Sequence, residues 1–88
     1  MRTVPRLSVI VPAHNEEEQI VQFLRDTLSS LDALGFDYEV VVVDDGSTDR
    51  TRERAISAAN SPRVKVVGYD YNVGKGFALK YGFGHTSG

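Results

Sequence analysis

The sequence predicts a three-layer α/β fold with the element order β-α-β-α-β-α and a parallel sheet of strand order 3-2-1. The first observation is the run Val40–Val43, because four consecutive β-branched residues are typical of a strand buried on both faces. The second observation is that helical patterns separate this run from two other short apolar runs. Strands that alternate with helices form βαβ units with right-handed crossovers. The most apolar strand therefore belongs in the middle of the sheet.

The composition is typical of one small globular domain. The chain has 88 residues, of which 41% are hydrophobic and 25% are charged. Its net charge of -2 argues against a nucleic-acid partner, since such surfaces are usually basic. The absence of cysteine excludes disulfides and thiolate metal sites and fits a reducing compartment. No apolar run reaches the length of a membrane span, so we expect no membrane segment and a cytoplasmic location.

The first strand is expected at Leu7–Val11, with Pro12 as its end. Asn15 is a good helix N-cap, and Glu18 stands three residues later at capping-box spacing. The helix that follows should end at Gly35. Its apolar stripe recurs at helical intervals through Ile20, Leu24, Leu28, Leu31 and Leu34.

The middle strand, Tyr38–Val43, runs into the adjacent carboxylates Asp44 and Asp45 and then into Gly46, which permits a tight turn. Two neighbouring carboxylates raise each other's pKa and cost stability. We therefore expect a compensating group beside them.

The second helix is expected at Asp49–Asn60, capped by Ser47, Thr48 or Asp49, with the charged cluster Arg52–Arg54 on a solvated face. Its inward positions are Ala55, Ile56 and Ala59. The third strand is expected at Val64–Val67, with Tyr69 as its outer limit. A third helix should begin at Phe77 and expose Phe77, Tyr81 and Phe83.

Three polar loops follow the three strands: Pro12–Glu16, Asp44–Asp49 and Asn72–Gly76. Open parallel sheets bind ligands outside the carboxyl ends of their strands. Each loop alone is also explained by turns and helix caps, and the glycines near Lys75 lack the spacing of a phosphate loop.

Together, however, the three loops suit a nucleotide. Asp44 or Asp45 can accept an N–H of the base, Glu16 can accept ribose hydroxyls, and Lys75 with glycine N–H groups can approach a diphosphate.

Three segments, Ser8–Glu17, Val41–Asp49 and Asn72–Leu79, resemble in order and spacing the opening motifs of family 2 glycosyltransferases with the GT-A fold. The resemblance covers Leu7–Gly88 and is strongest to polyprenyl (dolichyl)-phosphate mannose or glucose synthases. It implies the N-terminal half of a Rossmann-like domain that binds a nucleotide-sugar donor.

The resemblance also implies a set of donor-binding residues. Asp45 is expected to be the main base contact with Asp44 in support, and His14 stands where Tyr is common, so its imidazole would stack on the nucleoside. With the neighbouring loop residues, the expected set is Pro12, His14, Asn15, Glu16, Val43, Asp44, Asp45, Gly46, Ser47, Lys75 and Gly76.

The family further implies a divalent metal, Mg²⁺ or Mn²⁺, held by an Asp-x-Asp motif on the next strand. This sequence contains no Asp-x-Asp, so neither metal ligands nor catalytic residues are assigned. Residues 1–88 are therefore expected to be the donor-binding part of a domain truncated before that strand, inactive alone and prone to self-association through an open sheet edge.

The implied parent activity is transfer of a hexose from GDP-mannose or UDP-glucose, with a polyprenyl phosphate at the cytoplasmic face of a membrane as a candidate acceptor. A non-catalytic nucleotide-binding or interaction module is the alternative that the sequence leaves open.

Overall fold

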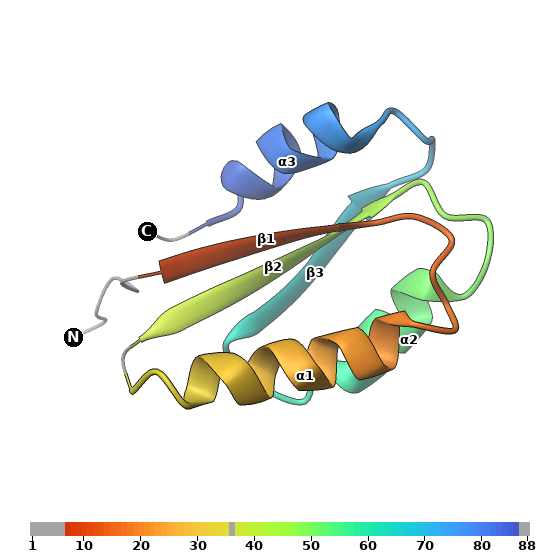
Figure 1. Cartoon of the computed structure of the whole chain (residues 1–88). Coiled ribbons are helices and arrows are strands. Elements are labelled where there is room, and N and C mark those ends of the chain that lie inside the picture. Colours follow the sequence, from red (N-terminus) through yellow and green to blue (C-terminus); the bar gives the residue numbers. More distant parts are fainter. Residues whose placement is uncertain (1–6, 36, 87–88) are drawn as a thin grey trace.

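The computed structural model describes residues 7–35 and 37–86 and confirms the alternating α/β fold (Figure 1). Its elements are, in order, β1 (Leu7–Ala13), α1 (Ile20–Asp32), β2 (Tyr38–Asp45), α2 (Thr51–Ala58), β3 (Val64–Tyr69) and α3 (Lys75–Phe83). Within these described residues, no helix combines the length and the apolar character needed to cross a bilayer.

The sheet has the order β1-β2-β3, and both strand pairs are parallel. Val9 lies opposite Val40 on one side of β2, and Val42 lies opposite Val66 on the other. The predicted order and the predicted middle strand are therefore confirmed.

Helices cover both faces of the sheet, with α1 and α2 on one face and α3 on the other (Figure 1). Successive side chains of a strand point to opposite faces. Val40 and Val42 accordingly pack with Ile20, Leu24 and Ala55, whereas Val41 and Val43 pack with Ala78. All four valines are 0% exposed, and burial of such a side chain contributes roughly 1.5–3 kcal/mol. The continuous valine run is thus explained by cover on both faces.

Strand β1 continues through Pro12 to Ala13 and does not end where the sequence predicted. Pro12 lies in register with Val43 and keeps its place in the strand. Because β1 is an edge of the sheet, a residue whose N–H faces away from β2 can be proline without loss of a ladder bond.

The predicted capping of α1 by Asn15 is wrong. The helix begins at Ile20, and Asn15 adopts a left-handed backbone conformation with φ 49°. The N–H groups of Gln19 and Ile20 both donate to the carbonyl of Glu16, at 3.0 and 2.9 Å, so a turn occupies the place of the first helical turn. At its other end α1 stops at Asp32, and Leu34 is 50% exposed instead of completing the apolar stripe.

Helix α2 is shorter than predicted, and its inward face is rotated. Thr51 and Ala55, four residues apart, are buried, which leaves Ile56 pointing outward with 58% exposure. Asp49 does serve the start of this helix, because its Oδ1 accepts the N–H of Thr51 at 2.9 Å.

Helix α3 begins at Lys75, two residues earlier than expected. Phe77 and Phe83 are exposed, as predicted, but Tyr81 is only half-exposed. The ring of Tyr81 packs edge-on against that of Tyr69, with centroids 5.1 Å apart.

Candidate functional site

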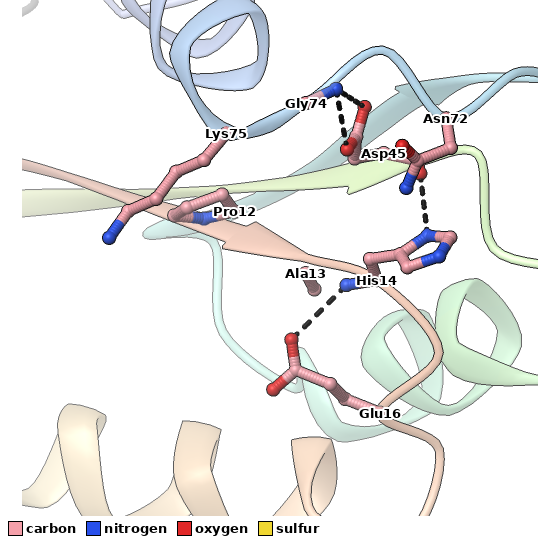
Figure 2. A pocket seen from close by; sticks show the side chains of 8 residues that line it. All are labelled: Pro12, Ala13, His14, Glu16, Asp45, Asn72, Gly74 and Lys75. Atoms are coloured by element: carbon pink, nitrogen blue, oxygen red, sulfur yellow. Dashed lines mark hydrogen bonds between the residues drawn. The ribbon is translucent and has the colours of Figure 1, made fainter.

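A cavity of about 420 Å³ lies at the carboxyl ends of β1 and β2, where the three polar loops meet (Figure 2). In Figure 2, His14 and Glu16 come from the first loop, Asp45 from the end of β2 and Lys75 from the start of α3. The lining residues are Pro12, Ala13, His14, Glu16, Asp45, Asn72, Gly74 and Lys75.

The first loop is joined to the end of β2 by His14. Its Nδ1 lies 2.8 Å from the backbone carbonyl of Asp45, and a carbonyl only accepts, so Nδ1 carries the proton and donates. The Nε2 atom lies 3.4 Å from the side-chain amide of Asn15, and Glu16 Oε1 accepts the N–H of His14 at 3.1 Å. The imidazole is thus held between β1 and β2 at the edge of the cavity.

Asn15 joins the first loop to the second. Its N–H donates to Ser47 Oγ at 3.0 Å, and its Oδ1 accepts the N–H of Thr48 at 2.9 Å. Asn is among the few non-glycine residues that adopt a left-handed conformation readily, and here its side chain uses that conformation to bind the neighbouring loop. Asn15 and Ser47 therefore fix the first loop against the second and do not line the cavity.

Asp44 points toward α2, away from the cavity. Its carboxylate is buried, with Oδ2 accepting from Arg52 Nε at 3.0 Å and Oδ1 accepting the N–H of Ser47 at 3.2 Å. Arg52 is the compensating group that the sequence led us to expect, and its side chain, which is 40% exposed, belongs only in part to the solvated face predicted for it. Its Nη2 also donates to the carbonyl of Tyr69 at 3.1 Å.

Asp45 points to the opposite face, toward α3, and is 4% exposed. Its Oδ1 accepts from the Tyr69 hydroxyl at 2.5 Å and from the N–H of Val73 at 3.0 Å. The N–H of Gly74 is shared by both oxygens, at 3.2 Å from Oδ1 and 3.0 Å from Oδ2.

Hydrogen bonds keep the Asp45 carboxylate ionised in spite of its burial. Burial raises the pKa of this carboxyl, but the bonds from Tyr69, Val73 and Gly74, with a smaller effect of His14, outweigh it and leave the pKa below its ordinary value. Burial and the bond to Asp45 raise the pKa of Tyr69, so its hydroxyl keeps the donated proton. Since a carboxylate offers about four acceptor positions, Oδ2 retains capacity for one further donor.

Gly46 lets the second and third loops touch. It has φ 62°, and a Cβ at this position would lie 2.1 Å from the carbonyl carbon of Tyr71. Only glycine fits both the backbone conformation and the contact. Gly46 thus serves the assembly of the cavity and does not line it.

The structure brings five of the predicted site residues to the cavity: Pro12, His14, Glu16, Asp45 and Lys75. Six others lie outside its lining: Asn15, Val43, Asp44, Gly46, Ser47 and Gly76. Val43 is fully buried against α3, because its position in the strand alternation faces the core. Three lining residues were missed, namely Ala13, Asn72 and Gly74, although the last two belong to the third polar loop and that membership was the available signal.

The carboxylates in the described part of the chain do not fit a divalent metal on their own. No group of three or more His, Cys, Asp or Glu side chains there is arranged to hold an ion. Asp44 and Asp45, the two buried carboxylates nearest the loops, already accept bonds from Arg52, Tyr69 and backbone N–H groups.

A family model described as glycosyl transferase family 2 matches residues 8–88. The chain belongs to glycosyl transferase family 2. The resemblance of the three sequence motifs to this family is thereby confirmed, and the motifs contain the loops that meet at the cavity.

Two relatives within the family are undecaprenyl-phosphate 4-deoxy-4-formamido-L-arabinose transferases. That of Edwardsiella ictaluri (strain 93-146) is 38% identical over 89 aligned positions, and the alignment covers 99% of this chain and 27% of the relative. That of Enterobacter sp. (strain 638) is 33% identical over 90 aligned positions, and the alignment covers 100% of this chain and 28% of the relative. The chain therefore spans little more than a quarter of the length of these relatives.

Two solved structures of transferases share the fold. The mannosyltransferase PcManGT from Pyrobaculum calidifontis, in complex with GDP-Man and Mn²⁺, superposes with a TM-score of 0.76 at 30% identity, covering 96% of this chain and 25% of the other. Glucosyl-3-phosphoglycerate synthase from Mycobacterium tuberculosis, in complex with Mn²⁺, UDP-glucose and phosphoglyceric acid, superposes with a TM-score of 0.71 at 35% identity, covering 96% and 30%. The Rossmann-like GT-A fold predicted from the sequence is confirmed.

Proposed function

We propose that residues 1–88 form the N-terminal donor-binding part of a glycosyltransferase that transfers a sugar from a nucleoside-diphosphate sugar. The observation that carries this proposal is the cavity lined by residues from all three family motifs. The solved neighbours, which hold GDP-Man and UDP-glucose, support hexose donors such as GDP-mannose or UDP-glucose. The two relatives are named for a derivative of arabinose, which is a pentose. The proposal of a hexose donor therefore rests on the two solved neighbours alone.

Within this proposal, each lining side chain suits one part of the donor. The free position on Asp45 Oδ2 accepts an N–H of the base, and the imidazole of His14 offers a flat face to the nucleoside. Glu16 accepts ribose hydroxyls, and the ammonium group of Lys75 meets the diphosphate. Gly76 lies in the first turn of α3, where N–H groups lack intrahelical partners and favour anions.

The catalytic residues, the metal and the acceptor site are proposed for the longer enzyme. We assign no catalytic residue and no metal ligand to this chain, and we propose that the enzyme uses Mg²⁺ or Mn²⁺, in keeping with the Mn²⁺ of both solved neighbours. The names of the relatives support a polyprenyl phosphate acceptor, and we propose with it that the enzyme acts at the cytoplasmic face of a membrane. Self-association of the 88-residue polypeptide through its open sheet edges is a further proposal.

Titration of GDP and UDP into the wild-type chain and the Lys75→Ala variant, followed by NMR, tests the donor site. We expect the variant to bind each diphosphate about tenfold more weakly, because a charge-assisted contact of this kind is lost. Binding of guanosine and uridine, which carry no phosphate, should be unchanged.

Lys80→Ala is the matched control, since Lys80 is an exposed lysine of the same helix that does not line the cavity. Equal affinity of the wild type and Lys75→Ala would remove Lys75 from the site. Absence of shifts near Glu16, Asp45 and Lys75 would refute donor binding altogether. Turnover of GDP-mannose or UDP-glucose by this polypeptide, with Mg²⁺ or Mn²⁺ and polyprenyl phosphate, would refute the assignment of catalysis to other residues.

A further inference from the structure

We propose that Tyr69 is a positioning residue of the donor site. Its hydroxyl fixes the carboxylate of Asp45, which in turn holds the third loop and the start of α3 so that Lys75 faces the cavity. The role of Lys75 in this inference rests on the proposed function, whereas the positioning of the loop does not.

Tyr69 is itself held at three points. As the last residue of β3 it lies in register with Asp45, and its hydroxyl donates to Asp45 Oδ1 at 2.5 Å. Its ring makes edge contacts with Phe77 and Tyr81 of α3, at centroid distances of 5.2 and 5.1 Å. Its carbonyl accepts from Arg52 at 3.1 Å. The hydroxyl is therefore presented to Asp45 by a side chain with little freedom to move.

Asp45 holds the two residues that lead into α3. The residue before the helix is Gly74, which has φ 119° and no side chain to accept the first N–H groups. Asp45 accepts the N–H groups of Val73 and Gly74 from β2, 28 and 29 residues earlier in the chain. A carboxylate at this place also interacts favourably with the helix dipole. Because Lys75 follows Gly74 directly, the orientation of the Asp45 carboxylate determines where the lysine leaves the loop.

The Tyr69 hydroxyl is what selects one orientation of that carboxylate. The terminal torsion of an Asp side chain is broad and roughly two-fold, so two backbone donors alone restrain it weakly. A short O–H···O⁻ bond to Oδ1 adds a strong, directional restraint. It also leaves Oδ2, with its free acceptor position, on the side of Gly74 and the cavity.

The test compares Tyr69→Phe with Tyr81→Phe. Both variants keep their rings in the aromatic cluster, but the Tyr81 hydroxyl donates to the carbonyl of Gly68 at 3.3 Å and does not touch Asp45. We expect amide hydrogen exchange at Val73 and Gly74 to rise about tenfold in Tyr69→Phe and to stay unchanged in Tyr81→Phe. Affinity for GDP and UDP should fall roughly threefold to tenfold in Tyr69→Phe only.

A double-mutant cycle shows whether the effect passes through Lys75. The loss of affinity caused by Tyr69→Phe should be smaller in a Lys75→Ala background, because the part that passes through Lys75 is then already absent and only the part that passes through the base contact of Asp45 remains. An equal loss in both backgrounds would overturn the link to Lys75. Unchanged exchange at Val73 and Gly74 would overturn the positioning role itself. If the wild type bound no nucleotide, the proposed function would fail, and the exchange measurement would still decide whether Tyr69 positions the loop.

Discussion

At the scale of single residues, the adjacent Asp44 and Asp45 show how two like charges can occupy the end of one strand. Strand alternation sends the first carboxylate toward α2 and the second toward α3. Each then accepts from a different donor, Arg52 in one case and Tyr69 in the other. The need for compensation was predictable from sequence, because neighbouring carboxylates are unfavourable without it. The identity of the partners was not, because both arrive from other elements.

The lowered pKa of Asp45 predicts acid-sensitive stability. A carboxyl whose folded-state pKa lies below its ordinary value of 3.8 stabilises the fold fully above that value and loses this contribution as the pH falls through the folded-state pKa. The free energy of unfolding of the wild type should therefore decrease below about pH 4. Asp45→Asn, which cannot titrate, should be less stable at pH 7 and should lose less on acidification.

Urea unfolding of both proteins between about pH 7 and about pH 3 measures this difference. Some acid dependence should persist in the variant, because hydrogen bonds from Thr51 and Glu17 outweigh burial and lower the pKa of Asp49 as well. Parallel pH profiles for the wild type and Asp45→Asn would contradict the prediction.

At the scale of elements, the sequence predicted which helices and strands exist and in what order, since hydrophobic periodicity is a local signal. Their boundaries depend on contacts between distant residues. Asn15 has the features of a helix cap, but it is hydrogen-bonded to Ser47 and Thr48 of the neighbouring loop, and α1 begins only at Ile20. Ile56 has the features of a core residue, but the burial of Ala55 turns it outward.

For the candidate site, too, the sequence predicted the general arrangement but not the direction of each side chain. The topology of a parallel sheet was sufficient to bring the three loops together, and five of the expected side chains line the cavity. Whether a given residue faces the cavity or the core depends on strand alternation at the last positions of β2, as Val43 and Asp44 show. The contact of Tyr69 with Asp45 was not predictable, because nothing in its sequence context marks a residue that acts through another side chain.

The packing of α3 on the sheet gives a prediction at this scale. A Cβ at Gly82 would lie 2.5 Å from Ile10 Cγ2 and 2.8 Å from Val43 Cγ2, both on stiff β-branched side chains. Gly82→Ala should therefore lower the free energy of unfolding by about 1 kcal/mol, because overpacking outweighs the better helix propensity of alanine.

Gly84→Ala is the matched control, since a Cβ at Gly84 would meet its nearest atom, the Tyr81 carbonyl oxygen, at 3.5 Å. It should be neutral or slightly stabilising. Chemical denaturation of the two variants measures the difference, and a Gly82→Ala variant as stable as Gly84→Ala would show that α3 is not held closely against β1 and β2.

At the scale of the whole molecule, apolar surface is concentrated along α3. Phe77, Leu79 and Phe83 are 46%, 39% and 71% exposed on this helix. Within residues 7–35 and 37–86, β3 has a strand partner on one side only, and unlike β1 it contains no proline. Exposed apolar side chains and an open strand edge both favour association with another chain.

We therefore expect the 88-residue polypeptide to self-associate, and sedimentation velocity over a range of concentrations measures this directly. Phe83→Lys replaces the most exposed phenylalanine of α3 by a charge, so it should shift the equilibrium toward monomer. Ile56→Lys makes a comparable change at a residue that is 58% exposed on α2, which covers the opposite face of the sheet, and it should leave the association unchanged. Equal effects of the two substitutions would indicate nonspecific hydrophobic contact. A wild-type chain that remains monomeric at every concentration would contradict the expectation, because the exposed rings of α3 and the free edge of β3 would then lack the attraction that their chemistry predicts.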